Sequence, residues 1–148
     1  MELLIITDHQ NPLFMDAFKL YFKELGINVR NYEALFEEMN SDIGTVTFAY
    51  VENNQLVAFL MCKADILTNW FFEMKFGFIR EFWVNDGYRN QGIGSSLLKE
   101  VEAHFKSSGI EYLMLTTDTA PSFYMKHGFI PASSIVAKNQ DDVYIKRL

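Results

Sequence analysis

Near the N-terminus, apolar and polar positions follow first a strand period and then a helical one. The short apolar run at residues 2–7 predicts a strand, after which Asn11 and Pro12 predict the start of a helix that Gly26 ends. The apolar residues of this helix recur at the spacing of one face: Phe14, Ala17, Phe18, Tyr21, Phe22 and Leu25. Asn31 predicts the cap of a second, shorter helix, and one of its sides carries Leu35, Phe36 and Met39.

After the two helices the pattern becomes typical of strands. Residues 45–51 and 55–64 flank the turn-prone pair Asn53 and Asn54, and this arrangement predicts a hairpin. The only cysteine, Cys62, lies in the apolar run VAFLMC without basic neighbours that would activate a thiol. We therefore expect Cys62 to be a small buried hydrophobic residue.

The following run, residues 70–84, is too long and too aromatic for one regular strand. Gly77 is therefore predicted to mark a bend or a bulge, with residues 78–84 as the better-defined part. We expect the aromatic cluster WFFEMKFGF to contribute to the core and to a groove wall, with Trp70, Phe71 or Phe72 lining a substrate pocket.

The second half of the chain predicts a strand, helix, strand unit. Apolar positions at helical spacing run through residues 92–109, and EYLMLTT at residues 111–117 again reads as a strand. Such a unit joins two parallel strands by a right-handed crossover, and its first loop lies at a strand's carboxyl end. A short helix at residues 121–126 and strands at residues 129–137 and 143–146 follow. The fold class is therefore mixed α/β.

Composition and charge restrict the classes of protein to which the chain can belong. The chain has 148 residues, of which 49% are hydrophobic. This length and composition predict a single domain over residues 1–148 with a full core. It contains neither a basic N-terminal leader nor a membrane-spanning apolar run, so we expect no membrane association and a cytoplasmic protein. The net charge of -6 argues against nucleic-acid binding and slightly favours a cationic substrate.

The glycine turn RNQGIG, residues 89–94, joins the strand to the helix of this unit. The first N–H groups of a helix point outward at the positive end of its dipole, and such a turn can bind a phosphate. A dinucleotide-binding loop would need glycine where Leu97 stands, and a P-loop would need a lysine that is missing, which also disfavours a nucleotide-binding switch domain. From this hexapeptide alone, a helix start with glycines for packing remains an equal alternative.

A second motif follows about thirty residues later, and with the first it resembles a known family. The run FWV-NDGY-RNQGIG-SSLL and the residues Ala120, Tyr124, Gly128 and Phe129 of APSFYMKHGF resemble the acyl-CoA core of the GNAT superfamily of N-acetyltransferases. The resemblance implies a mixed, mostly antiparallel sheet of six to seven strands with a parallel splayed pair and about four flanking helices. One departure is Thr117, where many members have asparagine.

The resemblance also implies a cofactor and a reaction. Acetyl-CoA would bind with its pantetheine arm beside Phe82, Trp83 and Val84. Its pyrophosphate would bind at the glycine turn, formed by Arg89, Asn90, Gln91, Gly92, Ile93, Gly94 and Ser95. A primary amine of a small molecule, a polyamine or a peptide would attack the thioester directly.

Two residues are candidates for the proton transfers of this reaction. Glu81 stands where several family members place an acidic residue and would act as the base, while Tyr124 would protonate the leaving thiolate. The N–H of Val84 would stabilise the developing oxyanion. Each residue also has an alternative role. Glu81 could form a solvated charge pair with Arg80, Tyr124 could be a packing aromatic, and Arg89 could contact solvent or a carboxylate.

Three further alternatives complete these expectations. A protein of the same fold that binds acyl-CoA as a sensor, or acts through protein contacts, would need no catalysis. A homodimer formed through the last strands is possible. His9, His104 and His127 lack the spacing of metal ligands, so we expect no metal site and expect the histidines at the surface or at helix caps.

Overall fold

The computed structural model describes residues 1–148 and confirms the mixed α/β class. Seven strands form a sheet of order β1-β2-β3-β4-β5-β7-β6, in which β4 and β5 are parallel. The strands are β1 (Glu2–Ile6), β2 (Thr45–Glu52), β3 (Gln55–Thr68), β4 (Glu73–Val84), β5 (Tyr112–Thr117), β6 (Ile130–Pro131) and β7 (Asp142–Arg147). The helices are α1 (Pro12–Glu24), α2 (Tyr32–Ser41), α3 (Ile93–Ser107) and α4 (Pro121–Lys126), with a 3-10 turn η1 (Asp86–Tyr88). None of the helices is long and apolar enough to cross a membrane.

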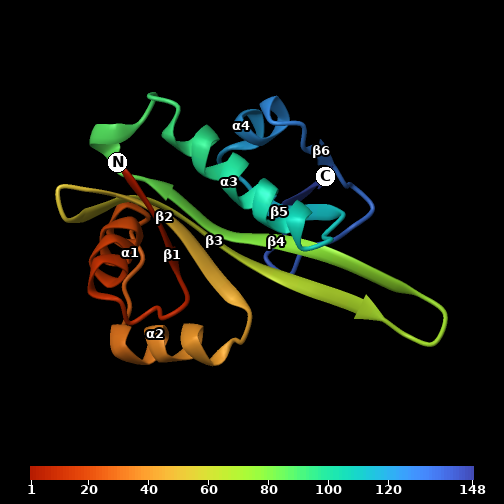
Figure 1. Ribbon diagram of the computed structural model, residues 1–148, viewed down its shortest axis with the longest axis horizontal. Helices are drawn as coiled ribbons and strands as arrows, with labels where there is room; N and C mark the ends of the chain where they lie inside the picture. The colour runs from red at the N-terminus through yellow and green to blue at the C-terminus, as the bar shows by residue number, and fades with distance from the viewer. The chain divides into compact units, whose positions relative to one another are not determined.

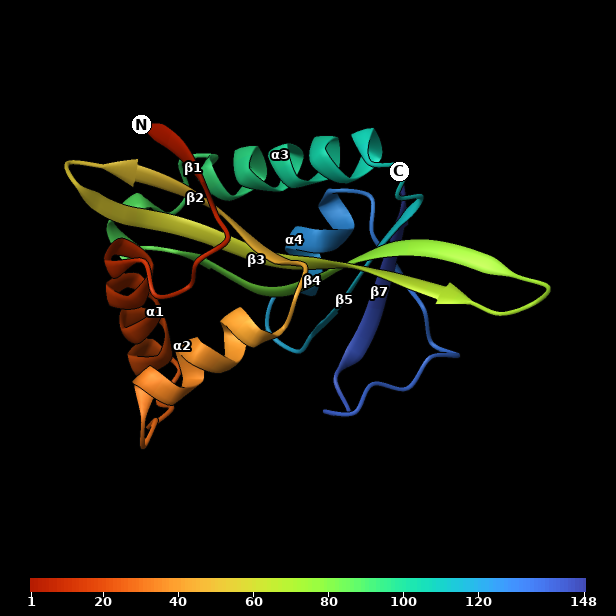
Figure 2. The same ribbon diagram turned by 60° about the horizontal axis from the view of Figure 1, so that its bottom comes forward.

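The chain divides into two compact units. The first unit contains residues 1–62 and 81–101, and the second contains residues 63–80 and 102–148. In the first unit β1 pairs with β2 in antiparallel register, and α1 and α2 lie on the same side of these strands (Figures 1 and 2). The predicted caps are confirmed, because the Asn11 side chain accepts from the Leu13 and Phe14 N–H groups and that of Asn31 from Ala34.

The core of the first unit is built from aromatic rings. Phe14 is fully buried, and its ring centroid lies 5.1 Å from that of His9 and 5.5 Å from that of Phe59. The surface position expected for His9 is therefore wrong: the residue is 0% exposed. Its Nε2 lies 2.9 Å from the Thr47 hydroxyl oxygen, and this hydrogen bond offsets the cost of burying a polar ring.

The second unit contains the parallel pair that the strand, helix, strand pattern predicts. Phe76 of β4 lies opposite Tyr112 of β5, and Phe78 opposite Met114. β5 then pairs with β7 in antiparallel register over its whole length. The predicted strand at residues 129–137 is wrong beyond Pro131, because β6 contains only two residues. The Ala132 N–H donates one further bond to the Val143 carbonyl of β7, at 2.8 Å, and residues 132–141 form a loop.

The run of residues 70–84 is not one strand, because residues 70–72 precede β4, but no break in the strand marks Gly77. β4 runs unbroken from Glu73 to Val84 through Gly77. A Cβ at Gly77 would lie 2.7 Å from the side chains of both Leu113 and Phe105, which are themselves buried. The glycine therefore allows α3 and β5 to approach the strand closely, and it does not interrupt the strand.

Replacing Gly77 by valine is expected to lower the free energy of unfolding by about 1–3 kcal/mol, because neither buried neighbour has room to move. Urea denaturation of the purified variant measures the loss. Gly87→Val is the matched control, since Gly87 has no positive φ and a Cβ there would come no closer than 3.6 Å to a neighbouring atom, so its stability should change by no more than about 0.5 kcal/mol. Equal stability of Gly77→Val and the unchanged protein would show that the contact with Phe105 is not tight.

Candidate functional site

The glycine turn of the first unit follows the end of β4 and is closely braced. The Asn85 N–H donates to the Val57 carbonyl at 2.8 Å, and its side-chain oxygen accepts from the Gly87 N–H at 3.1 Å. Asn90 and Gly92 both adopt left-handed conformations, with φ of 61° and 79°. Asparagine and glycine are the residues that adopt this conformation at least cost, which explains their position in the turn.

The turn leads directly into α3. The Ser96 N–H donates to the Gly92 carbonyl at 3.0 Å, so Gly92 is the residue from which the helix starts. The Ser96 hydroxyl lies 2.7 Å from the Tyr50 hydroxyl, and this contact joins the first turn of the helix to β2. The N–H groups that open a helix have no acceptor within it and lie at the positive end of its dipole. The turn can therefore bind an anion through backbone groups held in fixed positions.

Arg89 braces the turn against β4 and α1. Its Nε donates to the Val84 carbonyl at 2.8 Å, and one terminal nitrogen lies 2.6 Å from a Glu24 carboxylate oxygen. The other terminal nitrogen lies 3.5 Å from Asp86. Of the alternatives that the sequence left open, contact with a carboxylate is the one observed here. Two carboxylates compensate the guanidinium charge, so an anion at the turn would depend mainly on backbone N–H groups.

The end of β4 presents alternate side chains to α1. The Tyr21 hydroxyl donates a hydrogen bond to the half-buried Glu81 carboxylate, and the Trp83 indole N–H donates to Glu24 at 3.2 Å. Trp83 is only 4% exposed and belongs to the core, which leaves its backbone for contact with a ligand. Because strand side chains alternate, Phe82 and Val84 share the opposite face of the strand.

Two residues of this site, Tyr21 and Glu24, were missed as functional candidates from the sequence. In the sequence, Tyr21 belongs to the apolar stripe of α1, and no motif includes Glu24. They lie three residues apart, so both occupy the helix face that meets Glu81 and Trp83. A carboxylate at the edge of an otherwise apolar stripe was the available signal.

Tyr124 belongs to the second unit, whereas Glu81 and the glycine turn belong to the first. The Tyr124 side chain is 8% exposed, and its ring meets that of Phe129 edge to face, with the ring centroids 5.6 Å apart.

Thr117, the departure from the family pattern, stabilises the start of α4, because its hydroxyl oxygen accepts a hydrogen bond from the Ala120 N–H at 3.2 Å. His127 is the C-cap of α4, as predicted.

The described side chains do not favour thiol chemistry or metal binding. Cys62 is fully buried, and burial raises the pKa of its thiol to about 12, so it is not a nucleophile. This agrees with its predicted role as a buried hydrophobic residue. No three His, Cys, Asp or Glu side chains are grouped so that they could hold a metal ion.

Comparison with known proteins connects this geometry to a family. A model of the acetyltransferase (GNAT) family matches residues 8–129, a span that includes the glycine turn and Tyr124. No curated protein matches the chain.

Several solved structures share the fold. A predicted acetyltransferase from Clostridium acetobutylicum, solved with acetyl-CoA, has a TM-score of 0.77 and 17% identity, covering 92% of this chain and 94% of that one. A GNAT-family acetyltransferase from Staphylococcus aureus has a TM-score of 0.73 and 19% identity, covering 99% of each chain. Tetrahymena GCN5 has a TM-score of 0.70 and 15% identity, covering 99% of this chain and 96% of that one.

Proposed function

The chain belongs to the GNAT family of acetyltransferases, and from this premise we propose that it transfers the acetyl group of acetyl-CoA to a primary amine. The acceptor would be a small molecule, a polyamine or a peptide, and the negative net charge favours a cationic one. The observation that carries the proposal is the family match over residues 8–129, which includes both motifs. Turnover of acetyl-CoA across polyamines, aminoglycosides, amino acids and peptides tests it.

The backbone of the glycine turn is the proposed site for the pyrophosphate of acetyl-CoA. The N–H groups that open α3 supply donors, and the positive φ of Gly92 directs the chain so that they lie together. A Cβ at Gly92 would meet nothing within 4 Å, so the space beside this residue is open. Arg89 would hold the turn in shape through its bonds to Val84 and Glu24.

Asn90→Asp is expected to weaken the binding of acetyl-CoA about tenfold, because it adds a negative charge beside a pyrophosphate without changing side-chain volume. Aspartate tolerates the left-handed conformation that Asn90 adopts, with φ of 61°. Calorimetric titration with acetyl-CoA measures the dissociation constant, and the deficit should shrink at high salt.

Asn54→Asp is the matched control for this charge. Asn54 is also an exposed asparagine with a left-handed φ, of 59°, and the substitution changes the net charge of the chain by the same amount. We expect its affinity for acetyl-CoA to be unchanged. An equal loss of affinity in both variants would mean that net charge, and not the turn, controls binding.

Glu81 is the proposed base, acting on the amine directly or through a water. An amine with a pKa of about 10.4 is mostly protonated at neutral pH, so it must lose a proton before it can attack. The hydrogen bond from Tyr21 fixes the orientation of the Glu81 carboxylate. In this arrangement Tyr21 is a positioning residue for the base.

Glu81→Gln is expected to lower kcat/KM about tenfold at pH 7, and the deficit should shrink as the pH approaches the pKa of the amine. Glutamine keeps an oxygen that can accept from Tyr21, so the fold is retained. A pH profile of kcat/KM measures the effect, with Glu73→Gln on the same strand as the control. A deficit that stays constant with pH would rule out Glu81 as the base.

Tyr124 and the backbone of Val84 complete the proposed machinery. Acetyl-CoA, when bound, supplies an acetyl group activated as a thioester. The Val84 N–H would donate a hydrogen bond to the oxygen that gains negative charge as the amine attacks. Tyr124 would donate its proton to the departing thiolate, which suits a phenol held in a buried, well-packed position.

A further inference from the structure

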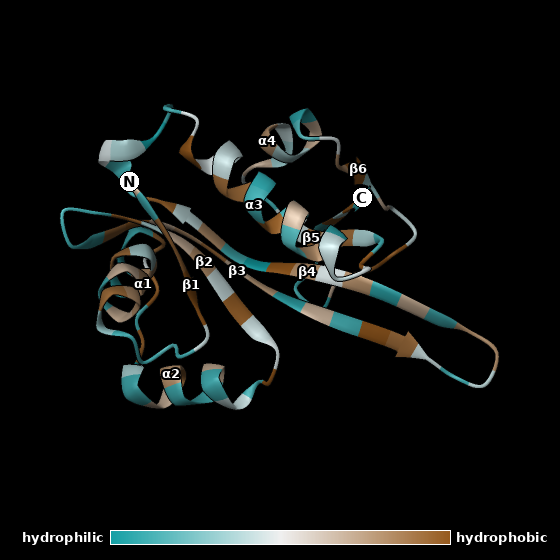
Figure 3. Ribbon diagram, in the orientation of Figure 1, coloured by the Kyte–Doolittle hydropathy of each residue, from teal (hydrophilic) through white to brown (hydrophobic).

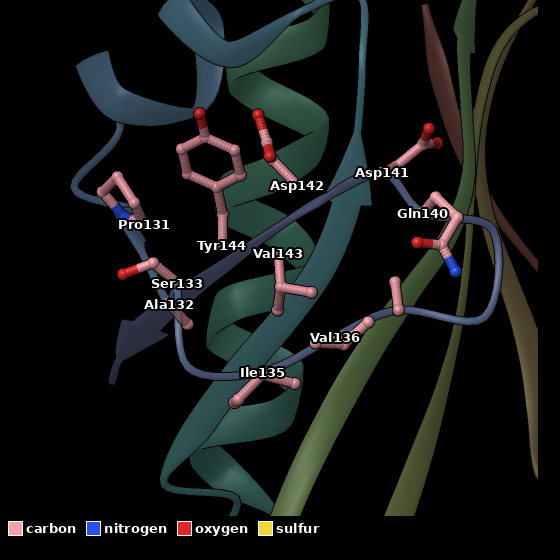
Figure 4. Close-up of a pocket in the computed structure, with 11 residues that line it drawn as sticks. Pro131, Ala132, Ser133, Ile135, Val136, Gln140, Asp141, Asp142, Val143 and Tyr144 are labelled. Carbon is pink, nitrogen blue, oxygen red and sulfur yellow. The ribbon is translucent and has the colours of Figure 1, made fainter.

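Thr117 is a polar residue that the second unit buries at the end of a strand. It is the last residue of β5 and is only 9% exposed. Across the sheet it pairs with Asp142 of β7, which Figure 4 labels on that strand. A buried hydroxyl lowers stability unless it forms hydrogen bonds, so Thr117 requires partners at this place.

The partners of Thr117 are backbone groups of the segment that leads to α4. The Thr119 N–H donates to its hydroxyl oxygen at 3.3 Å, and the Ala120 N–H donates to the same oxygen at 3.2 Å. Bonds from the N–H groups two and three residues later close a tight local turn. One hydroxyl therefore fixes the path of the chain from the end of β5 to the start of α4.

The helix α4 has few other contacts that hold its position. It contains six residues, of which only Tyr124 is buried, and its ribbon in Figure 3 includes hydrophilic residues. Its N-cap is Ala120, whose side chain cannot accept a hydrogen bond, and Pro121 follows at the first turn. Because so short a helix is unstable by itself, the bonds at its ends determine where it lies. Thr117 supplies the bonds that the N-cap side chain cannot.

The backbone of Tyr124 is joined to this turn. Its N–H donates to the Ala120 carbonyl at 3.4 Å, so the residue that is bound to Thr117 also accepts from Tyr124. The Tyr124 carbonyl in turn accepts from the His127 N–H at 3.0 Å and from the Phe129 N–H at 3.1 Å. Both backbone groups of Tyr124 are therefore bonded, and a shift of Ala120 would move the residue.

The ring of Tyr124 follows its backbone because neighbouring rings confine it. Its centroid lies 5.3 Å from that of Phe123 and 5.6 Å from that of Phe129, and both contacts are edge to face. A displacement of α4 would therefore displace the phenol hydroxyl. Proton transfer requires hydrogen-bond distance, and a misplacement of about 1 Å can lower a rate about 100-fold.

The hydrogen bonds of Thr117 disfavour a role as a proton acceptor for the substrate. A hydroxyl oxygen has two acceptor lone pairs, and the N–H groups of Thr119 and Ala120 use both. An influence of Thr117 on catalysis would therefore pass through the position of α4.

We propose that Thr117 is a positioning residue for Tyr124. Its hydroxyl oxygen holds the start of α4 and thereby sets the place of the phenol. The inference rests on the proposed function, in which Tyr124 protonates the leaving thiolate, and it assigns to Thr117 no contact with either substrate.

Thr117→Val removes the hydroxyl and keeps the shape of the side chain. We expect kcat to fall about tenfold, because the phenol would no longer be held in place. The dissociation constant of acetyl-CoA should stay unchanged, since the glycine turn belongs to the first unit. Steady-state kinetics and calorimetric titration measure the two quantities.

Two further variants serve as controls. Thr117→Ser keeps the oxygen and should keep kcat within about twofold of that of the unchanged protein. Thr116→Val removes the same hydroxyl from the neighbouring position of β5, where its partner is the Asn139 side chain at 3.3 Å, and its kcat should change as little. Full activity of Thr117→Val, or an equal loss of kcat in Thr117→Ser, would overturn the proposal.

Combining Thr117→Val with Tyr124→Phe tests whether the effect passes through the phenol. If it does, Thr117→Val lowers kcat only when the phenol is present, and the double variant has the same kcat as Tyr124→Phe alone. An equal fold loss of kcat in both backgrounds would show that Thr117 acts independently of Tyr124, which contradicts the proposal.

Amide hydrogen exchange tests the positioning without turnover. The Tyr124 N–H is expected to exchange about tenfold faster in Thr117→Val, and at an unchanged rate in Thr117→Ser and Thr116→Val. An unchanged protein that acetylates no amine would contradict the proposed function. Unchanged exchange at Tyr124 in Thr117→Val would contradict the positioning role, so the two failures are distinguishable.

Discussion

Replacing Tyr124 by phenylalanine is expected to lower kcat about 100-fold or more, while the dissociation constant of acetyl-CoA stays unchanged. The substitution removes only the hydroxyl that would protonate the leaving thiolate. The ring keeps its edge-to-face contact with Phe129, so the packing of α4 is retained. Steady-state kinetics at saturating acetyl-CoA, with calorimetric titration of the cofactor, measures both quantities.

Tyr112→Phe is the matched control, because it removes a phenol from β5 of the same unit at a position outside both motifs. We expect its kcat to be within about twofold of that of the unchanged protein. Unchanged turnover in Tyr124→Phe would show that another group, or solvent, protonates the thiolate. A loss of acetyl-CoA binding would instead assign Tyr124 to the cofactor site.

Replacing Phe14 by alanine is expected to lower the free energy of unfolding by about 3–5 kcal/mol. Phe14 is fully buried, and its ring lies within 5.9 Å of the rings of Phe36 and Phe59. Loss of the ring leaves a cavity that these neighbours cannot fill. Because a domain is stable by only about 5–15 kcal/mol, the variant should approach the limit of folding at physiological temperature.

Urea denaturation followed by circular dichroism measures this loss. Ile43→Ala is the control, since it removes an apolar side chain from a position that is 89% exposed, and the free energy of unfolding should change by no more than about 0.5 kcal/mol. A small effect at Phe14 would mean that the aromatic cluster repacks around the missing ring.

The elements of the fold could be predicted where local chemistry determines them. Asn11 and Asn31 cap helices because a short polar side chain satisfies N–H groups a few residues away, and this information lies within one turn of sequence. Gly77 was misinterpreted for the opposite reason. What requires glycine there is the approach of Phe105 and Leu113, which local sequence does not reveal.

Burial of individual residues was harder to predict than the elements themselves. His9 is polar yet fully buried, because Thr47 from a distant strand supplies its hydrogen-bond partner. Trp70 and Phe71 carry large aromatic side chains, yet they lie at the end of a hairpin and are almost fully exposed, contrary to the core position expected for them. Hydrophobicity alone does not state whether a side chain meets its own core or a partner.

At the candidate site, the sequence predicted the glycine turn but not the contacts that brace it. The turn is encoded within RNQGIG, where glycine and asparagine adopt left-handed conformations. The bond from Tyr21 to Glu81 joins residues that are 60 positions apart, and that from Arg89 to Glu24 spans 65. Such pairs follow from how α1 packs on β4, which the sequence pattern does not specify.

The measurement that tests the central claim most directly is acetyl transfer from acetyl-CoA to a panel of primary amines. Release of free thiol is followed together with the mass of each acceptor. The account predicts that at least one amine gains an acetyl group for every thiol released, and that Tyr124→Phe abolishes most of this turnover. Binding of acetyl-CoA without acetylation of any amine at any pH would contradict it, and would identify the chain as a non-catalytic acyl-CoA-binding member of the family.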